Sequence, residues 1–474
     1  MIDRRELMQL AENLGLQPQV VEKDYVLGWL LAGIRANTSL GEHWVFKGGT
    51  CLKKCYFETY RFSEDLDFTI TNETHLDPAF LTKAFSDISA WIYEQTGLEI
   101  PVDRLRFDVF RNKRDRLACE GRIYYRGPIA PRGSDLPRIK LDLTTDELLA
   151  MPPVERPVVH TFSDNPGAGI KTLCYAYEEV FGEKVRALGE RARPRDLYDV
   201  INLYRQEDFQ PQPDAILDVL KRKCEYKSIQ LPTLDTIKAS YDELSGDWQT
   251  MLAHQLPALP PLESFWNVLP EFFAWLAGGA RPAVPHSYPL AAGEVLLRQP
   301  LGTFSGPGIV SSALEIIRFA AANRLTVEID YVKETGERTT REIEAYALRR
   351  TSAGGVVLHV FDMAKNAHRS YRTDRIRSAR ATARIFSPRY AIELTPGGMQ
   401  AIPPTARTAT RGAFGGGFHG RSMRATGYSP TYVYECPVCS KKFPRKSHDS
   451  TLRPHRTPNG WECSGRAGYL VETR

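Results

Sequence analysis

Two aspartates one residue apart stand in the sequence "RFSEDLDFTI", between a glycine pair and an apolar strand pattern. Alternate residues of a β-strand point to the same face, so Asp65 and Asp67 would project together while Leu66 and Phe68 turn toward a core. Adjacent carboxylates repel each other unless a cation lies between them, and Mg²⁺ bound also by substrate phosphates is the commonest such cation. A solvated acidic strand edge explains the spacing about as well.

The neighbouring segments add features of a phosphate-binding site. The preceding "KGGT", Lys47 to Thr50, places glycines at the start of an expected helix, where the backbone can approach a bulky anion. It lacks the GxxxxGK[ST] spacing of a P-loop. Downstream, "RIKLDLTT" alternates Lys140, Asp142 and Thr144 on one strand face, which makes Asp142 a candidate third carboxylate.

A second group of candidate metal ligands lies near the C-terminus. Cys436 and Cys439 form a CxxC pair, and His455 and Cys463 can complete a tetrahedral Cys₃His set, as in a closed structural zinc site. The segment has few apolar residues, so a metal is its natural source of stability. His448 is the rival of His455, and a redox CxxC would need a βαβ context that is absent.

Basic residues surround these ligands, with Phe443 and Trp461 between them, as suits single-stranded or structured RNA. Residues 396–474 hold 12 Lys and Arg against 4 Asp and Glu, within a chain of net charge +5. We expect this end to contact phosphate, the alternative being ordinary surface lysines. The candidates are Lys441, Lys442, Arg445, Lys446, Arg453 and Arg456.

The pattern of helices and strands expected around these residues predicts an α+β protein of several domains. The N-terminal part alternates helices near 17–35, 50–57 and 78–97 with strands such as "HWVFKG" and "EDLDFTI". Helical periodicity follows, then a Pro/Gly-rich joint, a helix with short strands, and a Gly/Pro/Arg segment without periodicity. We expect a first domain at 1–207, its helical companion at 208–277, a linker at 278–304, a small β-rich domain at 305–394, a flexible linker at 395–430 and the zinc module at 431–474.

Composition excludes several classes of protein. The 474 residues are 42% hydrophobic and 25% charged, and no apolar run reaches the roughly 18 to 20 residues that span a bilayer. The N-terminus lacks the pattern of a secretory signal. The other cysteines are scattered and form no disulfide framework. We therefore expect a cytoplasmic protein without a membrane partner.

Four motifs, "VEKDYVLGWLL", "FKGGTCLKKCY", "RFSEDLDF" and "EKVRALGERARPRDLYDV", resemble in order and spacing the AbiEii/AbiGii toxin family of nucleotidyltransferases, to which the MenT toxins are similar. The resemblance covers roughly residues 5–205. It implies a polymerase-β-like nucleotidyltransferase fold and transfer of nucleotides from NTPs, in several members to the 3′ acceptor end of tRNA.

The resemblance also implies residue roles. Lys184 would neutralise phosphate charge and Asp196 is the late acidic residue of the family; a helix salt bridge with neighbours such as Glu183 or Arg195 is the alternative for both. Asp65 and Asp67 would bind the metal with Asp142, whose role is the least secure. The nucleotide-binding residues would be Lys47, Gly48, Gly49, Thr50 and Ser63.

Residues from "ALEIIRFAAANR" to "IFSPR" are similar to the WYL domain, an Sm-like β-barrel, with "VEIDY", "REIEAYAL" and "RSYRTDRI" as matching features. The name-giving Trp-Tyr-Leu stands here as Val357-Leu358-His359, so ligand sensing is not implied. The resemblance makes Arg369, Arg372 and Arg375 candidates for nucleic-acid binding, with a solvated basic strand as the equal alternative.

Together these features predict a nucleotidyltransferase toxin or phage-defence enzyme that transfers NMP from an NTP to RNA, with the tRNA 3′ acceptor end as the favoured acceptor. Two Mg²⁺ ions would assist in-line attack with release of pyrophosphate, Zn²⁺ would be structural, and a cognate antitoxin would be a partner. One alternative is a protein nucleotidyltransferase of the AMPylase type. The other is a non-enzymatic WYL-type regulator that binds nucleic acid.

Overall fold

The computed structural model describes residues 1–14, 18–57, 61, 65–129, 135–160, 162–206, 211–283, 285–296 and 311–394, and in the last segment 432–436, 439, 441–445, 452–455, 457, 463 and 469–473. The chain divides into two compact units, Met1–Ala406 and Arg407–Arg474. Among the described residues, no helix combines the length and hydropathy needed to cross a bilayer.

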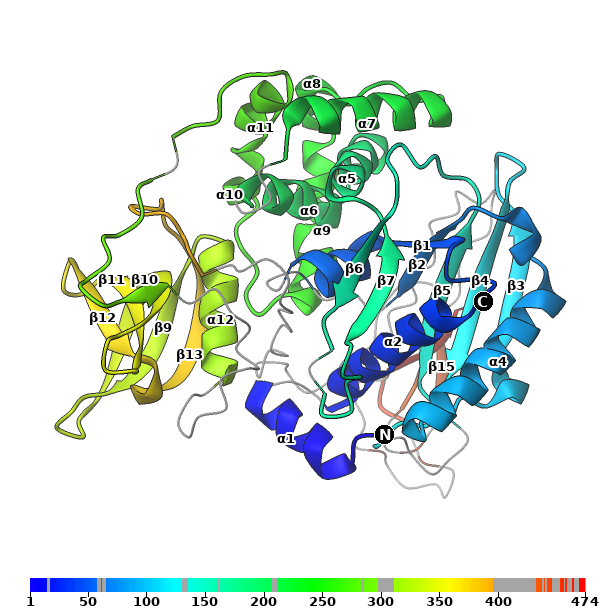
Figure 1. Cartoon of the computed structure of the whole chain (residues 1–474), viewed down its shortest axis with the longest axis horizontal. Helices are drawn as coiled ribbons and strands as arrows, with labels where there is room; N and C mark the ends of the chain where they lie inside the picture. Colours follow the sequence, from blue (N-terminus) through cyan, green and yellow to red (C-terminus); the bar gives the residue numbers. More distant parts are fainter. Residues whose placement is uncertain are drawn as a thin grey trace. The chain divides into compact units, whose positions relative to one another are not determined.

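A mixed seven-stranded sheet forms the centre of the N-terminal part (Figure 1). β2 pairs with β5, and β1 with β7, in parallel, while the other neighbours are antiparallel. In spatial order the strands are β3 (Arg106–Arg111), β4 (Leu117–Tyr124), β5 (Arg138–Thr144), β2 (Leu66–Ile70), β1 (Trp44–Lys47), β7 (Ile170–Cys174) and β6 (Val154–Val158).

Two long helices, α2 (Pro18–Ala36) and α4 (Pro78–Thr96), cover one face of this sheet (Figure 1). α4 begins at a good N-terminal signal, because the Asp77 side chain accepts a hydrogen bond from Phe80 N and Pro78 occupies the first turn. α1 (Arg4–Leu14) packs on α2. The strand residues that face these helices are apolar, so the opposite face carries the polar residues of β2, β4 and β5.

Sequence periodicity predicted α2, β1, β2, α4 and β5, and the structure confirms these elements. Two boundaries differ. The expected helix near 50–57 is α3 (Gly48–Cys51) followed by a π-helical turn, η1 (Leu52–Tyr56), and β2 begins at Leu66, so Asp65 lies just before the strand.

Helices follow the sheet along the chain, and α5 packs on both α6 and α7. Aromatic side chains fill their shared core: the ring of Phe181 stacks on Phe272 and Trp275, and Tyr198 stacks on Phe265. The helices are α5 (Tyr177–Arg191), α6 (Pro194–Arg205), α7 (Pro213–Lys227), α8 (Leu234–Lys238), α9 (Tyr241–Leu252), α10 (Glu263–Trp266) and α11 (Leu269–Leu276).

The next part is an antiparallel sheet with helix α12 (Ser311–Ala322) against β13, β9 and β10 (Figure 1). Among its described strands no pairing joins β12 to β13, so the sheet is an open path and the barrel stays a prediction. In order the strands are β12 (Ala367–Arg372), β11 (Val356–Asp362), β10 (Arg338–Arg350), β9 (Leu325–Val332) and β13 (Ile376–Ile385), with β8 (Val295–Leu296) beside β10.

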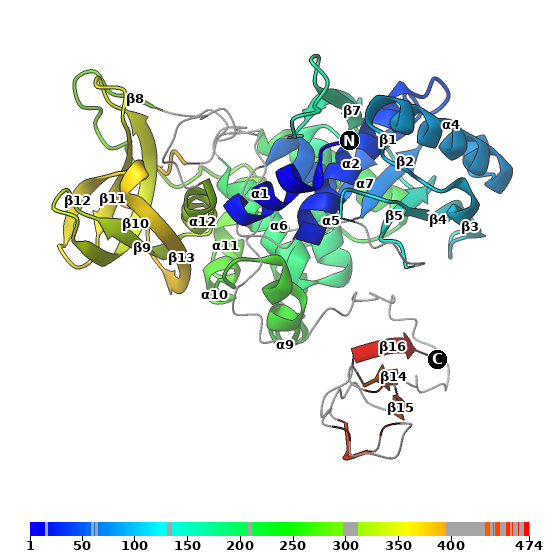
Figure 2. The same ribbon diagram turned by 90° about the horizontal axis from the view of Figure 1, so that it is seen from below.

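The second unit contains a three-stranded antiparallel sheet in which β14 lies in the middle (Figure 2). Its strands are β14 (Tyr432–Glu435), β15 (Lys442–Arg445) and β16 (Tyr469–Thr473).

Candidate active site

The predicted carboxylates meet on the polar face of the seven-stranded sheet. Asp67 in β2 lies directly opposite Asp142 in β5, and on its other side it lies opposite Lys47 in β1. Asp65 is exposed at the entry of β2, where the Thr50 hydroxyl donates a 2.6 Å hydrogen bond to its carbonyl oxygen. The parallel pairing of β2 with β5 therefore brings the third candidate carboxylate beside the first pair.

The charge around Asp67 fits a divalent cation. Burial and the negative charges of Asp142 and Asp65 raise the pKa of Asp67 to about 6, although Lys47 and Lys184 act in the opposite direction. Three carboxylates this close together form a site of negative charge, and hard divalent cations take oxygen ligands of this type. These residues thus fit the Mg²⁺ that nucleotidyl transfer requires. Asp142 also accepts a 2.9 Å hydrogen bond from Lys140 Nζ.

The glycine turn that begins α3, Gly48 and Gly49, lies against the Asp67 carboxylate. Gly48 has φ +83°, and a Cβ at this position would lie 2.2 Å from Asp67 Oδ2. Glycine is thus required both by the backbone conformation and by the close approach. Gly49 and Thr50 are buried in α3. The hydrogen bond from the Thr50 hydroxyl to the Asp65 carbonyl positions the backbone of Asp65. Ser63 lies outside the described residues.

Lys184 and Asp196 are both buried and lie in separate ion pairs. Lys184 Nζ is 2.8 Å from Asp199 Oδ2, and Asp196 accepts hydrogen bonds of 2.7 and 2.8 Å from Arg191. Both residues therefore form salt bridges, as in the alternative to a catalytic role, but their partners are Asp199 and Arg191 and not Glu183 or Arg195. Lys184 remains close enough to the sheet for its charge to act on Asp67.

Sequence reasoning missed two residues of this network, Asp199 and Arg61. Asp199 is fully buried and accepts hydrogen bonds from Arg61 Nε at 2.8 Å and Nη2 at 2.9 Å. Although burial opposes it, the charges of Arg61 and Lys184 lower the pKa of Asp199. The available signal was the second aspartate of "RDLYD", one helical turn after Asp196.

Comparison with known proteins decides the family. The family model described as nucleotidyl transferase AbiEii toxin of a type IV toxin–antitoxin system matches residues 29–277, and a WYL domain model matches residues 312–381. The chain belongs to the AbiEii family of nucleotidyltransferases. The AbiEii and WYL predictions are therefore confirmed, and this AbiEii chain is an NTP-using nucleotidyltransferase.

Solved structures similar to the AbiEii chain include MenT4, a nucleotidyltransferase toxin of Mycobacterium tuberculosis, with 18% identity, 58% of this chain and 87% of that chain covered, and a TM-score of 0.34. The proteasome accessory factor PafBC of Arthrobacter aurescens is similar at 12% identity, with 79% and 74% covered and a TM-score of 0.15. No curated protein matches the chain.

The second unit of the AbiEii chain assembles the predicted zinc ligands. The ligand atoms of Cys436, Cys439, His455 and Cys463 all lie within 4.8 Å of one another. Cys436 Sγ is 3.6 Å from Cys463 Sγ, and Cys439 Sγ is 3.2 Å from His455 Nε2. His455 Nδ1 lies 2.9 Å from the carbonyl of Arg453, which orients the ring with Nε2 toward the thiols. This donor set fits Zn²⁺; His448 lies outside the described residues.

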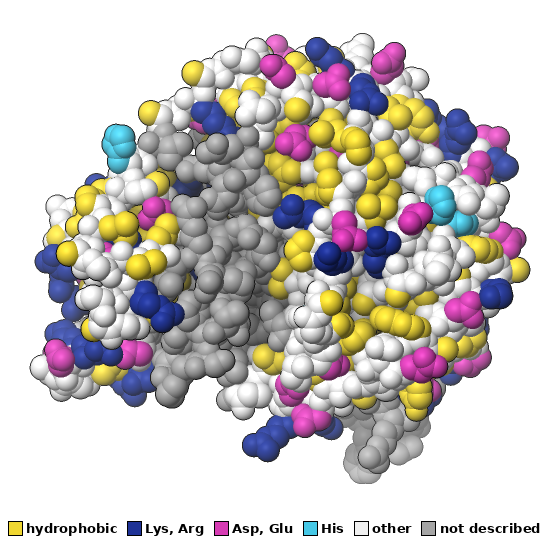
Figure 3. Space-filling model, in the orientation of Figure 1, with side chains coloured by type: hydrophobic (Ala, Val, Ile, Leu, Met, Phe, Trp, Pro, Cys, Tyr) yellow, Lys and Arg dark blue, Asp and Glu magenta, His cyan; other side chains and the backbone are white. Residues whose placement is uncertain are grey.

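The predicted basic residues are placed only in part. Lys441, Lys442 and Arg453 are exposed, the side chain of Arg445 lies outside what the structure describes, and so do Lys446 and Arg456. In the WYL region Arg369 and Arg372 are exposed on β12, where Arg372 pairs with Asp374, while Arg375 pairs with Glu334. On the face drawn in Figure 3, Lys and Arg are interspersed with Asp and Glu.

A buried thiol cluster lies directly after the glycine turn. Cys51 and Cys55 are one helical turn apart, β7 brings Cys174 beside them, and the three sulfur atoms lie within 4.8 Å of one another. That Cys174 lies beside Cys51 and Cys55 could not be predicted, because it depends on the parallel pairing of β1 with β7, which is not visible in the sequence. Burial raises the pKa of the Cys51 and Cys55 thiols, so they behave as core residues.

Proposed function

We propose that this AbiEii chain transfers a nucleoside monophosphate from an NTP to RNA, with the 3′ acceptor end of tRNA as acceptor, by in-line attack assisted by two Mg²⁺ ions. The observation that carries the proposal is the register of the polar sheet face, where Asp67 lies between Lys47 and Asp142, with Asp65 one residue before β2. Residues 1–207 with the helical companion at 208–277 would form the catalytic part.

Asp65, Asp67 and Asp142 would hold Mg²⁺, which supplies charge neutralisation for the triphosphate and a lower pKa for the attacking hydroxyl. The negative charges of Asp142 and Asp65, which together with burial raise the pKa of Asp67, support a cation at this position. Because Gly48 has no side chain, the Asp67 carboxylate can pack against its backbone, and the Thr50 hydroxyl fixes the backbone at Asp65. These contacts preorganise the carboxylates before substrate binds.

Lys184 would stabilise negative charge on the phosphate oxygens, which is the main contribution of a protein to phosphoryl-type transfer. Its ion pair with Asp199, itself held by Arg61, limits the positions that the ammonium can occupy. Asp196 and Arg191 form a second pair on the same helix junction and would act by positioning α6. Lys47, paired with Glu147 at 3.5 Å, lies on the other side of Asp67.

The remaining parts would serve substrate and partner binding. Zn²⁺ in the Cys₃His set would stabilise the second unit, whose exposed Lys441, Lys442 and Arg453 support a contact with RNA phosphate. The WYL domain would close as an Sm-like barrel and present Arg369 to nucleic acid or to a cognate antitoxin. Linkers at 278–304 and 395–430 would join these domains.

The test is incubation of the purified full chain with Mg²⁺ and each α-phosphate-labelled NTP in turn, with total bacterial RNA or with RNA-free protein lysate. We expect label in a tRNA-sized band, lost in Asp67→Asn and retained in Asp87→Asn, an exposed control on α4. Label in protein alone would instead establish the AMPylase-type activity. A folded protein that labels neither would contradict the proposal.

A further inference from the structure

Charged side chains on the polar sheet face form two rows of opposite sign. Asp67 and Asp142 are the first members of a row that crosses four neighbouring strands in register: Asp67 (β2), Asp142 (β5), Glu120 (β4) and Asp108 (β3). A second row is cationic and begins two residues before Asp142 on β5: Lys140 (β5), Arg122 (β4) and Arg106 (β3). The two rows are about 7 Å apart along the strands, and their side chains pair with one another: Lys140 Nζ lies 2.9 Å from Asp142 Oδ2, and Arg122 Nη1 lies 2.8 Å from Asp108 Oδ2.

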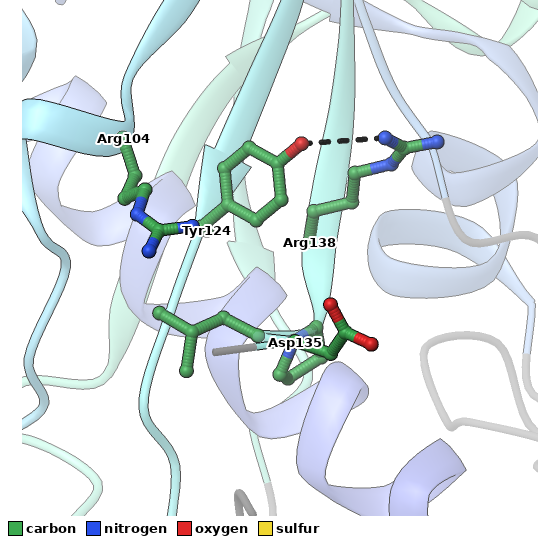
Figure 4. Close-up of a pocket in the computed structure, with 6 residues that line it drawn as sticks. Arg104, Tyr124, Asp135 and Arg138 are labelled. Carbon is green, nitrogen blue, oxygen red and sulfur yellow. Dashed lines mark hydrogen bonds between the residues drawn. The ribbon is translucent and has the colours of Figure 1, made fainter. Parts of the chain in front are cut away.

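The next pair along the same strands is Arg138 on β5 opposite Tyr124 on β4. Arg138 Nη1 lies 3.4 Å from the Tyr124 hydroxyl and donates a hydrogen bond to it. These side chains line a pocket of about 390 Å³ together with Arg104, Asp135, Leu136 and Pro137 (Figure 4). Arg104 is exposed, and Tyr124 and Arg138 are half-buried, so an aromatic ring and two guanidinium groups are at least partly accessible.

This combination suits a nucleic-acid strand. An aromatic ring offers a stacking surface for a base of any sequence, and guanidinium groups bind phosphate through paired N–H groups. Arg138 is four residues from Asp142 on β5, a distance of about 13 Å. That length corresponds to roughly four stacked nucleotides at ~3.4 Å each. A strand whose end reacts at the carboxylates therefore reaches the pocket by running along β5 and across the cationic row.

We propose that Arg104, Tyr124 and Arg138 bind the acceptor RNA strand about four nucleotides from the hydroxyl that reacts. This inference rests on the proposed RNA acceptor. The ion pairs between the two rows explain why the contact begins at a distance from the carboxylates: Asp142, Glu120 and Asp108 neutralise Lys140 and Arg122. Among the residues that the structure describes, the pocket has two guanidinium groups and one carboxylate, that of Asp135.

The experiment measures the KM for tRNA, the KM for the NTP and kcat for Tyr124→Leu, Tyr124→Phe and Arg138→Gln. We expect Tyr124→Leu and Arg138→Gln to raise the KM for tRNA about tenfold with little change in the other two parameters, because stacking and phosphate contacts bind the acceptor only. Tyr124→Phe keeps the ring and should stay within about threefold of the wild type. Arg138→Gln should also reduce the salt dependence of RNA binding by about 0.7 in log–log slope.

Arg111→Gln is the matched control, since Arg111 is an exposed arginine of β3 outside the pocket and its loss changes the net charge equally. An unchanged KM for tRNA in Tyr124→Leu and Arg138→Gln would overturn the inference, as would a rise in the KM for the NTP instead. Fluorescence anisotropy with labelled tRNA separates this result from the proposed activity. Equal tRNA affinity of wild type and Tyr124→Leu overturns the inference whether or not RNA is the acceptor.

Discussion

Lys184 pairs with Asp199 and not with Asp196, although both aspartates lie on α6 one helical turn apart. Asp199 also binds Arg61, whose Nη1 donates a 3.0 Å hydrogen bond to Gln255 Oε1. Lys184 is thus fixed by residues from the segment before β2, from α6 and from the turn after α9.

We predict that Asp199→Ala lowers the free energy of unfolding by about 3 to 5 kcal/mol, because Arg61 and Lys184 would remain buried without their counter-charge. Asp87→Asn, which breaks an exposed pair with Lys83, should cost less than about 1 kcal/mol. Urea denaturation at pH 7 measures both. A loss at Asp199 as small as that of the control would show that the network is not a stabilising one.

The same network has a defined pH dependence. The folded pKa of Asp199 lies below the ordinary 3.8, so its stabilisation is present above that pH and is lost as the pH falls through the folded value. Asp199→Asn should therefore differ most from the wild type at neutral pH, and the two should converge in acid. The convergence should begin as the pH falls below about 3.8, so denaturation curves between pH 2 and pH 7 test it, and a difference that does not shrink below that pH contradicts it.

The pKa shift of Asp67 has the opposite sign to that of Asp199. Its folded pKa of about 6 lies above 3.8, so the ionised carboxylate destabilises the ion-free fold at pH values above 6, and the penalty disappears below the unfolded pKa. We predict that Asp67→Asn stabilises the EDTA-treated protein by about 2 to 3 kcal/mol at pH 8, and by roughly half as much at pH 5. The same variant should abolish nucleotidyl transfer. Urea denaturation in EDTA gives the first result, and a destabilised variant would sink the assignment.

Sequence reasoning could locate Asp65, Asp67 and Asp142 because the alternation of apolar and polar residues fixes which strand face each occupies. It could not show that Asp67 and Asp142 are neighbours, since β2 and β5 pair in parallel across more than 60 residues and strand pairing leaves no local signal. It also placed Asp65 within the strand, because periodicity does not determine where a strand begins.

Ion-pair partners were the least predictable feature. From the sequence, Glu183 was the expected salt-bridge partner of Lys184 because it is its neighbour on the same helix. In the structure the partner is Asp199, which the packing of α5 on α6 and of the segment at Arg61 brings beside Lys184. Glu183 is instead paired with Arg186 and Lys223. Such choices depend on tertiary contacts that propensity and periodicity do not contain.

Gly48→Ala should reduce the rate of nucleotidyl transfer at least about tenfold, because a Cβ 2.2 Å from Asp67 Oδ2 must displace the carboxylate from its position. The matched control is Gly97→Ala, which has a similar φ of +76° at the end of α4 but no atom within 4 Å of the added Cβ. Both variants should lose about 1 to 2 kcal/mol of stability through the left-handed backbone. Equal activity loss in both would mean that backbone strain, not the contact with Asp67, is responsible.

Zinc content separates the two histidine candidates of the C-terminal module. We predict that the purified chain carries about one zinc ion and that His455→Ala and Cys463→Ser lose it, since both atoms converge with Cys436 and Cys439. His448→Ala and Cys224→Ser, a buried cysteine of α7, should keep it. Elemental analysis by mass spectrometry measures the ion, and trypsin sensitivity of the tail reports whether its fold is lost with the metal, as expected for a metal-stabilised module. If His448→Ala loses zinc while His455→Ala retains it, the ligand set is wrong at this position, whereas retention in Cys463→Ser would exclude the site as described.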